Sequence, residues 1–386
     1  MRHENSKLKS NNHWDVIIIG AGPAGLALSA KIAHNNFNVL VLEKSRTDTE
    51  KLGESISPNG VNLVRSYFDL IGQEFIPSEI GFKPCDGNIS TWGKSAFDVQ
   101  DFMCSPAGYG LSLNRNQFEN SLRSVAEKVG VHISTGEKFS NIKENTQQQD
   151  GYRWAIDTID TVSHHEKTLY GKYIVDASGR ASVIAKSLGV TRNRHSNLFA
   201  YAMVFSSDND IHECNYTRIE ATQNGWWYSN IIPGFNEQKT GRIVVFHKTL
   251  DSSEKKTPFG LTNYFNELGL TKNIAPYLNA QDYMPHMKLH GANAACERLS
   301  SCQGRHWLAI GDAAQSYDPL SSQGITRAFE ASLLAAHEIL EDLNSNVSYN
   351  KKRYQRQQNI WWDEYRAIRE QCYSIEKRWP ESQFWQ

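Results

Sequence analysis

Residues 15–25 read Asp-Val-Ile-Ile-Ile-Gly-Ala-Gly-Pro-Ala-Gly, an apolar run followed at once by three glycines spaced Gly-x-Gly-x-x-Gly. The apolar run is typical of a buried strand. Gly20 allows a turn that a Cβ would obstruct, Gly22 allows a pyrophosphate to approach the backbone, and Gly25 allows the next helix to pack on the strand. The other positions of this predicted phosphate loop are Ala21, Pro23 and Ala24.

An acidic residue, Glu43, ends the next apolar run, Asn38-Val-Leu-Val-Leu42, and Lys44 follows it in the same predicted site. Glu43 lies about 20 residues after the glycines, the offset at which a carboxylate reaches a ribose hydroxyl. A helix that begins near Pro23 would present unpaired N–H groups and a positive dipole end to a phosphate. The stretch therefore predicts a dinucleotide site, and the alternative is an ordinary strand–helix–strand turn without a ligand.

Length, charge and cysteine spacing exclude several classes of function. The 386 residues are enough for two or three domains, and 41 Lys plus Arg against 42 Asp plus Glu leave a net charge of -1. This balance gives no reason to expect nucleic acid or an acidic membrane surface as a partner. The six cysteines show no Cys-x-x-Cys spacing, so we expect no metal site and reduced thiols.

The N-terminal 13 residues are polar and lack the apolar core of a secretory signal. No apolar run reaches the ~18 residues of a membrane-spanning helix. We therefore expect a cytoplasmic protein with no membrane partner. The sequence gives no indication of the oligomeric state.

Periodicity predicts an α/β protein with an inserted antiparallel sheet. Helices are expected near residues 59–70, from the Asn114 cap to Gly130, and over 323–343, and strands over 131–134, 152–160 and 169–175. Three β-rich runs between residues 198 and 247 have no helices between them, as in an antiparallel sheet. We expect a discontinuous cofactor domain from residues 14–80, 108–195 and 290–345, a substrate domain from 81–107 and 196–289, and a C-terminal helical segment over 346–386.

A second motif, Gly311-Asp-Ala-Ala-Gln-Ser-Tyr-Asp-Pro-Leu-Ser-Ser-Gln-Gly-Ile325, runs from a strand end to a helix start. Asp312 can accept a hydrogen bond from a ribityl hydroxyl, Pro319 fixes the approach of the chain, and Gly324 lets backbone N–H groups come close to a planar ring. The positive end of the following helix suits a reduced flavin with negative charge. The predicted cofactor is therefore FAD, in a single Rossmann-type FAD-binding domain, with Gln323 and Ile325 completing the loop.

Seven motifs taken together resemble those of a known superfamily. They are Gly20-x-Gly22-x-x-Gly25 with Glu43, Gly53-Glu-Ser-Ile-Ser-Pro58, Asn114-Arg115-x-x-Phe118, Asp176-Ala-Ser-Gly179, Gly225-Trp-Trp-Tyr228 with Pro233, Gly311-Asp312 through Gly324, and Glu376-Lys-Arg-Trp-Pro380. The chain resembles the single-Rossmann FAD-dependent monooxygenases and halogenases, most closely the LodB/GoxB-type flavoproteins of tryptophylquinone cofactor biogenesis. The resemblance implies that Arg115 lies near the phosphates or ribityl chain, Asp312 on the ribityl chain, and residues 319–325 under the isoalloxazine. The alternative interpretation of Arg115 is a surface arginine at a helix start.

Only one pyrophosphate fingerprint is present, so the sequence predicts no second domain for a nicotinamide. Electrons for the flavin are expected from a transiently docked NADH or NADPH, or from a separate partner flavin reductase. Both sources remain open.

Three activities are compatible with the motifs. The first is a monooxygenase, in which reduced FAD and O₂ deliver oxygen to an electron-rich aromatic ring in a dry pocket. The resemblance to LodB/GoxB proteins implies that this ring is a tryptophan side chain of a partner protein. That partner would be an immature quinone-dependent amine oxidase during cysteine tryptophylquinone biogenesis.

The second activity is halogenation of an aromatic substrate. Halogenases rely on a lysine, for which Lys83 is the candidate, and carry a W-x-W-x-I-P motif. This chain reads Trp226-Trp-Tyr-Ser-Asn-Ile-Ile-Pro233, which keeps an aromatic pair and the proline but changes the spacing. We therefore rank halogenation second, and interpret Lys83 first as a solvated or structural lysine.

The third possibility is a non-catalytic FAD-binding maturation factor that holds an immature partner. Trp361-Trp362 and the aromatic residues from Trp379 to Trp385 would then form a docking surface, and the alternative is that they pack the terminal segment on the body.

The remaining site candidates border the predicted flavin. Glu54 and Ser55 follow Gly53 in a turn-rich segment and are predicted near the isoalloxazine, although such a turn can be purely structural. Trp226 and Trp227 are candidate substrate-pocket residues, and strand alternation should send them to opposite faces of the sheet. The alternative is that both pack the core of that sheet.

Overall fold

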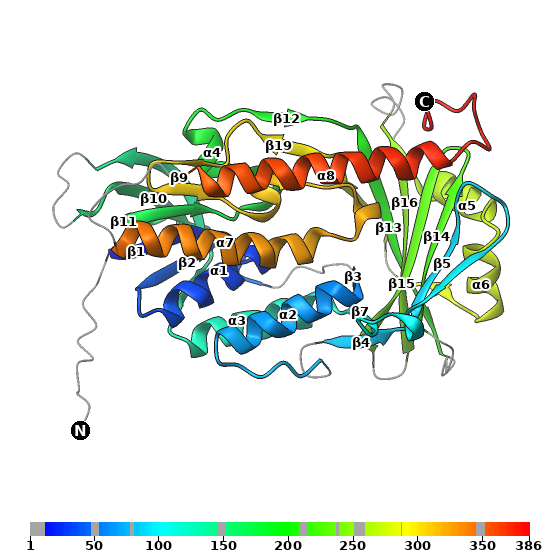
Figure 1. Cartoon of the computed structure of the whole chain (residues 1–386), viewed down its shortest axis with the longest axis horizontal. Helices are drawn as coiled ribbons and strands as arrows, with labels where there is room; N and C mark the ends of the chain where they lie inside the picture. The colour runs from blue at the N-terminus through cyan, green and yellow to red at the C-terminus, as the bar shows by residue number, and fades with distance from the viewer. Residues whose placement is uncertain are drawn as a thin grey trace.

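The computed structural model of the chain describes residues 12–47, 54–77, 81–145, 151–208, 215–236, 239–250, 259–286, 288–344 and 352–386. An α/β body occupies one end of the molecule, and a long antiparallel sheet stands across the other end (Figure 1). The predicted α/β fold with an inserted antiparallel sheet is therefore confirmed.

The sheet of the α/β body is built around β1 (His13–Ile19), which pairs in parallel with β2 (Val39–Glu43) and β11 (Glu166–Asp176). This arrangement confirms the predicted strand–helix–strand unit. The path continues to β8 (His132–Thr135) on one side and to β21 (Trp307–Ala309) and β20 (Gln303–Gly304) on the other. Two strands that extend the sheet from β11 are antiparallel: β10 (Trp154–Asp160) and β9 (Glu137–Glu144), the second of which the sequence pattern did not predict.

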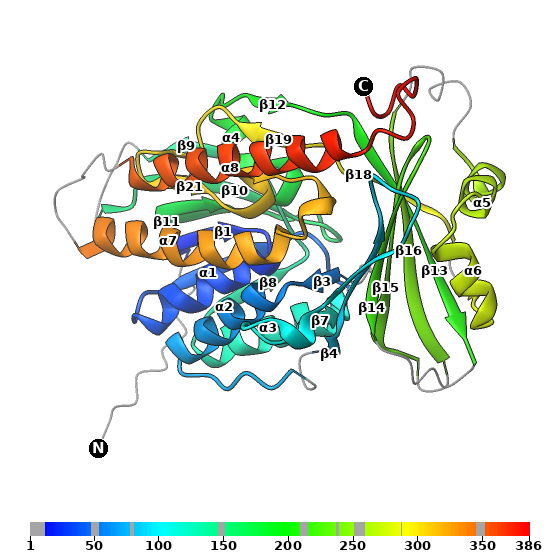
Figure 2. The same ribbon diagram turned by 45° about the vertical axis from the view of Figure 1, so that its right-hand side comes forward.

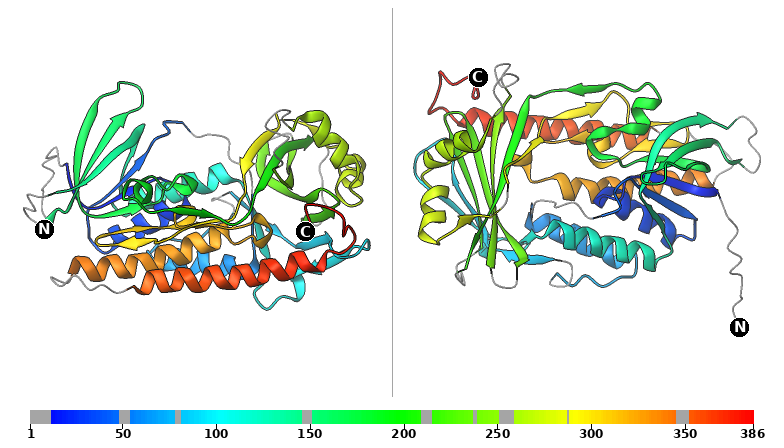
Figure 3. Two further views of the ribbon diagram at one scale, coloured as in Figure 1. Left: turned by 90° about the horizontal axis from the view of Figure 1, so that it is seen from above. Right: turned by 180° about the vertical axis from the view of Figure 1, so that it is seen from behind.

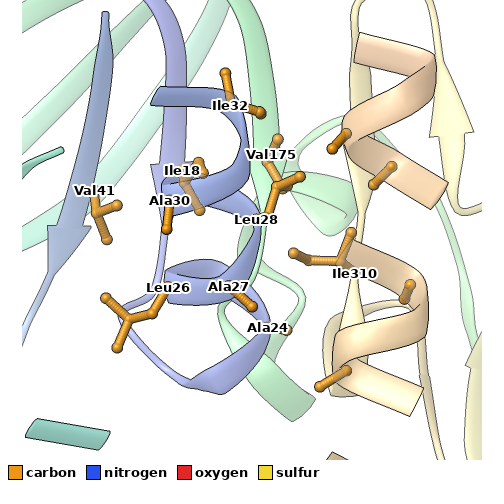
Figure 4. Close-up of a cluster of buried hydrophobic side chains, with 14 of the residues drawn as sticks. Ile18, Ala24, Leu26, Ala27, Leu28, Ala30, Ile32, Val41, Val175 and Ile310 are labelled. Atoms are coloured by element: carbon orange, nitrogen blue, oxygen red, sulfur yellow. The ribbon is translucent and has the colours of Figure 1, made fainter. Parts of the chain in front are cut away.

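Helix α1 (Pro23–His34) is buried on almost every side, between the sheet and α7 (Gly324–Asn344). Figure 4 shows Leu26 and Leu28 of this helix among Ile18, Val41 and Val175 of the strands. Leu28 is fully buried, so its truncation to Ala would cost about 2–5 kcal/mol. Small residues let α7 come close, and Ser332 Oγ donates to the carbonyl of Ala24 at 3.0 Å. The N-terminus of α1 is thus held firmly at the carboxyl end of β1.

Two further helices of the body have side-chain caps, of which the sequence predicted that of Asn114. In α2 (Pro58–Leu70) the Ser57 side chain accepts from the backbone N–H of Gly60, and in α3 (Arg115–Lys128) the Asn114 side chain accepts from Gln117. Gly130 follows α3 with φ +98°, as expected of a helix-terminating glycine. A short helix, α4 (Val183–Ser187), follows β11.

The second sheet has the strand order β17-β13-β16-β15-β14-β5-β6, with β18 also paired to β13. Its strands are β13 (Leu198–Ser207), β14 (Tyr216–Thr222), β15 (Gly225–Asn236), β16 (Lys239–Thr249), β5 (Gly87–Thr91), β6 (Asp98–Asp101), β17 (Met284–Pro285) and β18 (His290–Asn293). The pairing of β14 with β5 is parallel and the others are antiparallel. Helices α5 (Leu261–Gly269) and α6 (Ile274–Ala280) cover the face that points away from the α/β body (Figure 2).

Helix α8 (Arg353–Ile375) runs beside α7 along the long axis of the molecule (Figures 1 and 3). Residues 376–386 form turns rather than the helix expected there. Two three-stranded sheets complete the fold, β3 (Glu54–Ile56), β7 (Gly110–Leu113) and β4 (Phe82–Cys85), and β12 (Arg192–Arg194), β19 (Glu297–Leu299) and β22 (Gln315–Ser316). Among the helices described, none is both long and apolar enough to cross a membrane.

Candidate functional site

A cavity of about 460 Å³ opens at the carboxyl ends of β1, β2 and β11, where ligands bind in open α/β sheets. Its volume lies in the range of ligand and cofactor sites, about 300–1,000 Å³. Eleven of the predicted cofactor residues line it: Gly20, Gly22, Pro23, Ala24, Glu43, Lys44, Arg115, Gly311, Asp312, Gly324 and Ile325. Two motifs that are nearly 300 residues apart in the sequence therefore meet at one cavity.

The three glycines of the first loop have different environments. Gly20 has φ +112°, and a Cβ there would overlap the carbonyl of Ala177, while a Cβ on Gly25 would overlap the carbonyl of Gly20. Both glycines are thus required by close backbone packing. Gly22 differs, because a Cβ placed on it would meet no atom within 4 Å and would project into open space. Open space above this backbone, at the N-terminus of α1, fits an approaching pyrophosphate.

The Glu43 carboxylate supports the same loop. Oε2 accepts the backbone N–H of Ala21 and Oε1 accepts that of Ser45, each at 3.0 Å. A carboxylate offers about four acceptor positions, so two remain for ribose hydroxyls. Glu43 is therefore oriented by the chain and still able to bind a sugar.

Arg115 is the first residue of α3 and lines the cavity together with Glu119. Its Nε lies 2.6 Å from Glu119 Oε1, an ion pair between residues four apart on the helix. The helix start is tied to the second sheet, because Asn114 Nδ2 donates to the carbonyl of Pro233 at 3.0 Å. Sequence reasoning missed Glu119, for which the spacing of four from Arg115 was the available signal.

The second motif supplies the opposite wall of the cavity. Gly311 has φ +55°, and a carboxylate oxygen of the exposed Asp312 lies 3.6 Å from Nε of Arg180. Arg180 also donates to the carbonyl of Ala295 and to Ser316 Oγ, so it anchors Asp312 to the body of the protein. Arg180 directly follows the Asp176-Ala-Ser-Gly179 motif, but nothing in its spacing indicated this contact.

Asp176, the first residue of the Asp-Ala-Ser-Gly motif, is a buried carboxylate that supports the surrounding backbone. It is fully buried and accepts hydrogen bonds from Ser178 and from the backbone N–H groups of Ile184 and Ala185. Burial raises the pKa of Asp176, and these hydrogen bonds oppose the rise. The carboxylate thereby holds residues 177–179 against Gly20, and Ser178 and Gly179 line the cavity without having been predicted.

Five predicted cofactor residues lie outside the lining of the cavity: Ala21, Gly25, Ser55, Pro319 and Gln323. Ala21 and Gly25 act through the backbone contacts given above. Ser55 Oγ lies 3.3 Å from the hydroxyl of Tyr228 on β15, where β3 meets the second sheet. The side chain of Glu54 and residue Gly53 lie outside the described part of the chain.

Trp226 and Trp227 point to opposite faces of the second sheet, as strand alternation predicts. Trp226 faces the α/β side, stacks on His247 with ring centroids 3.7 Å apart, and donates from Nε1 to the Tyr373 hydroxyl at 3.0 Å. Trp227 packs on Phe246 in the core beneath α5, away from the cavity. The expectation that Trp227 lines a substrate pocket therefore needs correction, since Trp227 packs in the core between the second sheet and α5.

Two further candidates are placed by the structure. Lys83 is exposed on β4, where it pairs with Ser112 of β7, and it does not line the cavity. Of the C-terminal aromatic residues, Trp362 is buried and Trp385 Nε1 donates to the carbonyl of Thr222 at 2.9 Å. These two residues pack the terminal segment on the body, the alternative to a docking surface.

Comparison with known proteins agrees with this geometry. Residues 13–356 match the protein family described as FAD binding domain. Over 375 residues the chain is 28% identical to LodB of Marinomonas mediterranea, named as an FAD-dependent oxidoreductase, covering 97% of this chain and 96% of that protein. It is 24% identical over 345 residues to a brominase of pyrrole-2-carbonyl groups on a peptidyl-carrier protein, from Pseudoalteromonas luteoviolacea, covering 86% of this chain and 79% of that protein.

Two solved structures share the fold. The myxobacterial chondrochloren halogenase CndH superposes with a TM-score of 0.83 at 19% identity, covering 97% of this chain and 85% of that one. The peptidyl tryptophan dihydroxylase QhpG gives 0.72 at 17% identity, covering 97% and 78%. With a family match over most of its length and a cavity that fits the cofactor, the chain belongs to the FAD-binding-domain family and is an FAD-dependent oxidoreductase.

Proposed function

We propose that this protein is an FAD-dependent monooxygenase that hydroxylates an aromatic substrate, namely a tryptophan side chain of a partner amine oxidase during biogenesis of cysteine tryptophylquinone. The observations that support the proposal are the sequence match to LodB over nearly the whole chain and the fold shared with QhpG. LodB is matched across 96% of its length, and QhpG, described as essential for tryptophylquinone cofactor biogenesis, shares the fold over 97% of this chain.

When bound and reduced, FAD would supply the chemistry for transfer of oxygen from O₂ to an electron-rich ring. The residues of the chain then have positioning roles. Glu43 and the backbone at Gly22 would hold the ribose and diphosphate, and Asp312 would hold the ribityl chain. The sheet face that carries Trp226 is apolar, and such a wall would help to exclude water from the reaction. Electrons would come from NADH or NADPH, or from a partner flavin reductase.

A second candidate is halogenation, and the fold likeness to CndH and the relationship to the brominase favour it. Two features of this chain count against it. Lys83 is solvent-exposed instead of enclosed, and the aromatic motif at Trp226 has a changed spacing. A third candidate, the non-catalytic maturation factor, is weakened because Trp362 and Trp385 are used for internal packing.

The deciding experiment is co-expression with the protein encoded beside this chain, followed by intact-mass analysis of that protein. The proposal expects a gain of one or two oxygen atoms on a tryptophan. A gain of halogen would establish the second candidate instead. Maturation without any mass change, or in the presence of a variant that binds FAD but cannot be reduced, would establish the third.

A further inference from the structure

Three side chains of α8 converge on one buried residue, Asp318. Tyr365, Arg369 and Tyr373 are spaced by four residues and so share one face of the helix. Asp318, which is 1% exposed, accepts from the Tyr373 hydroxyl at 2.8 Å and from Arg369 Nε at 3.1 Å, both on Oδ2. Its backbone N–H donates to the Tyr365 hydroxyl at 2.9 Å. The C-terminal helix α8 therefore forms hydrogen bonds to both the side chain and the backbone of Asp318.

Asp318 in turn shapes the loop that follows it. Its Oδ1 accepts the backbone N–H of Leu320 at 3.0 Å and its carbonyl accepts Ser321 Oγ at 2.9 Å, which fixes the 3-10 turn Pro319–Ser321. The segment that contains this turn connects Asp312 to Gly324, and both of these residues line the FAD cavity. The position of Asp318 thus shapes the segment between two residues that line the cavity.

Tyr373 also connects Asp318 to the second sheet. Trp226 Nε1 donates to the Tyr373 hydroxyl, which donates to Asp318, so a chain of hydrogen bonds joins β15 to the flavin loop. Burial, and then the negative charge of Asp318, raise the pKa of Tyr373 well above its ordinary value. The phenol therefore keeps its proton and remains a donor to the carboxylate. Two residues further along β15, Tyr228 contacts Ser55 on the other side of the site.

We propose that Tyr373 is a positioning residue that sets the loop of residues 319–325, whose last two residues line the FAD cavity, against the second sheet by holding Asp318 and Trp226 together. The inference rests on the FAD site of the proposed function but not on the identity of the substrate. It assigns to the C-terminal helix a part in the active site, in addition to its packing on the body.

The test compares two tyrosine-to-phenylalanine variants, Tyr373→Phe and Tyr264→Phe. The Tyr264 hydroxyl donates to the carbonyl of Val244 at 2.9 Å, beneath α5 on the far face of the sheet. Each variant removes one hydroxyl that is hydrogen-bonded inside the protein and leaves the ring in place. Three quantities are measured for each: the urea midpoint, the dissociation constant of FAD from the apoprotein, and the visible absorption spectrum of the bound flavin.

Both variants should show a lowered urea midpoint. Only Tyr373→Phe should also weaken FAD binding, by about fivefold, and shift the flavin absorption bands, because only it releases the loop. Asp318→Asn should reproduce the change in the flavin spectrum. Combined with Tyr373→Phe it should add less than the sum of the two effects, since both substitutions act through the same loop.

The proposal is overturned if Tyr373→Phe loses stability while its FAD dissociation constant and flavin spectrum match those of wild type and Tyr264→Phe. Should Tyr373→Phe fail to fold, Asp318→Asn carries the same test with the same readouts. A wild-type chain that binds no FAD would overturn the FAD site itself. A chain that binds FAD but leaves tryptophan unchanged would overturn only the proposed substrate, and the spectral comparison would still decide the role of Tyr373.

Discussion

Glu43 Oε2 lies 3.0 Å from the backbone nitrogen of Ala21, so the carboxylate that ends β2 also supports the glycine loop that ends β1. One side chain thereby orders the phosphate loop and faces the cavity. The contact joins residues 22 apart in the sequence, which is why an acidic residue at this offset is informative.

The first prediction concerns the charge of this carboxylate. Glu43→Gln keeps an oxygen that can accept from Ala21 but removes the negative charge that strengthens a bond to a ribose hydroxyl. We expect FAD to bind the apoprotein roughly tenfold more weakly, since a hydrogen bond to a charged group contributes about 1.5–3 kcal/mol. Fluorescence titration measures this, with Glu144→Gln on the exposed end of β9 as control. Equal affinities for Glu43→Gln and the control would contradict the assigned role.

The second prediction separates two glycines of one motif. Gly22→Ala places a methyl group in open space at a φ of -78° that alanine adopts readily, so the apoprotein should unfold as the wild type does, within about 0.5 kcal/mol. FAD binding should nevertheless be lost, because the methyl group occupies the approach of the pyrophosphate. Gly25→Ala should instead destabilise the apoprotein by about 1–3 kcal/mol, since its Cβ meets backbone that cannot move aside.

Urea unfolding of the two apoproteins and titration with FAD test this contrast. A Gly22→Ala protein that binds FAD like the wild type would show that the diphosphate lies elsewhere.

The third prediction is a loss of stability in acid that arises from His247. Burial lowers the pKa of His247 from 6.5 to about 3, partly opposed by a hydrogen bond with the backbone of Trp226. Between these two values the unfolded chain binds a proton that the folded protein does not, so stability falls as the pH drops below 6.5. The loss from this group between about pH 7.5 and about pH 5.5 is roughly 1.4 kcal/mol.

Comparison of urea midpoints at the two pH values checks this effect. His247→Gln should lose less stability in acid than the wild type, whatever its stability near neutral pH. His306, whose pKa burial lowers to about 4, acts in an overlapping pH range and should preserve part of the acid sensitivity in that variant. An unchanged acid loss in His247→Gln would mean that His247 is not a buried neutral group.

Local sequence patterns identified eleven residues that the fold brings to one cavity. The glycine loop, Glu43 and Arg115 each lie next to a helix or strand end that the sequence itself marks, and all of them reach the cavity except the residues that act through backbone packing. Contacts across the fold were not predictable in this way. Tyr373 lies 55 residues from Asp318 and 147 from Trp226, and its neighbours on α8 give no signal of either contact.

Strand β9 is a second feature that the local sequence pattern does not predict. It carries Lys138 and Phe139, which line the cavity, but its burial alternates weakly because much of the strand is exposed to solvent. The pattern is therefore too polar for the sequence to indicate a strand. Only its pairing with β10 places these residues beside the cofactor site.

The fourth prediction distinguishes oxygenation from halogenation at Lys83. Because the Lys83 side chain is exposed and does not line the cavity, Lys83→Ala should change stability by no more than about 0.5 kcal/mol and should leave modification of the partner protein unchanged. The measurement is the intact mass of the co-expressed partner. Lys94→Ala, at another exposed lysine, is the matched control. Loss of modification in Lys83→Ala alone would revive the halogenase assignment.

The last prediction uses the alternation of the two tryptophans on β15. Trp227→Phe shrinks a ring in the closed core beneath α5, so it should destabilise the protein by about 1–3 kcal/mol but leave the bound flavin spectrum and turnover unchanged. Trp226→Phe removes the N–H that donates to Tyr373 and weakens the stacking on His247. Both contacts lie on the face of the second sheet that points toward the α/β body. We expect turnover of the partner protein to fall several-fold in this variant while FAD remains bound. Equal turnover in the two variants, each measured with its FAD content, would show that the face of the sheet has no bearing on the reaction.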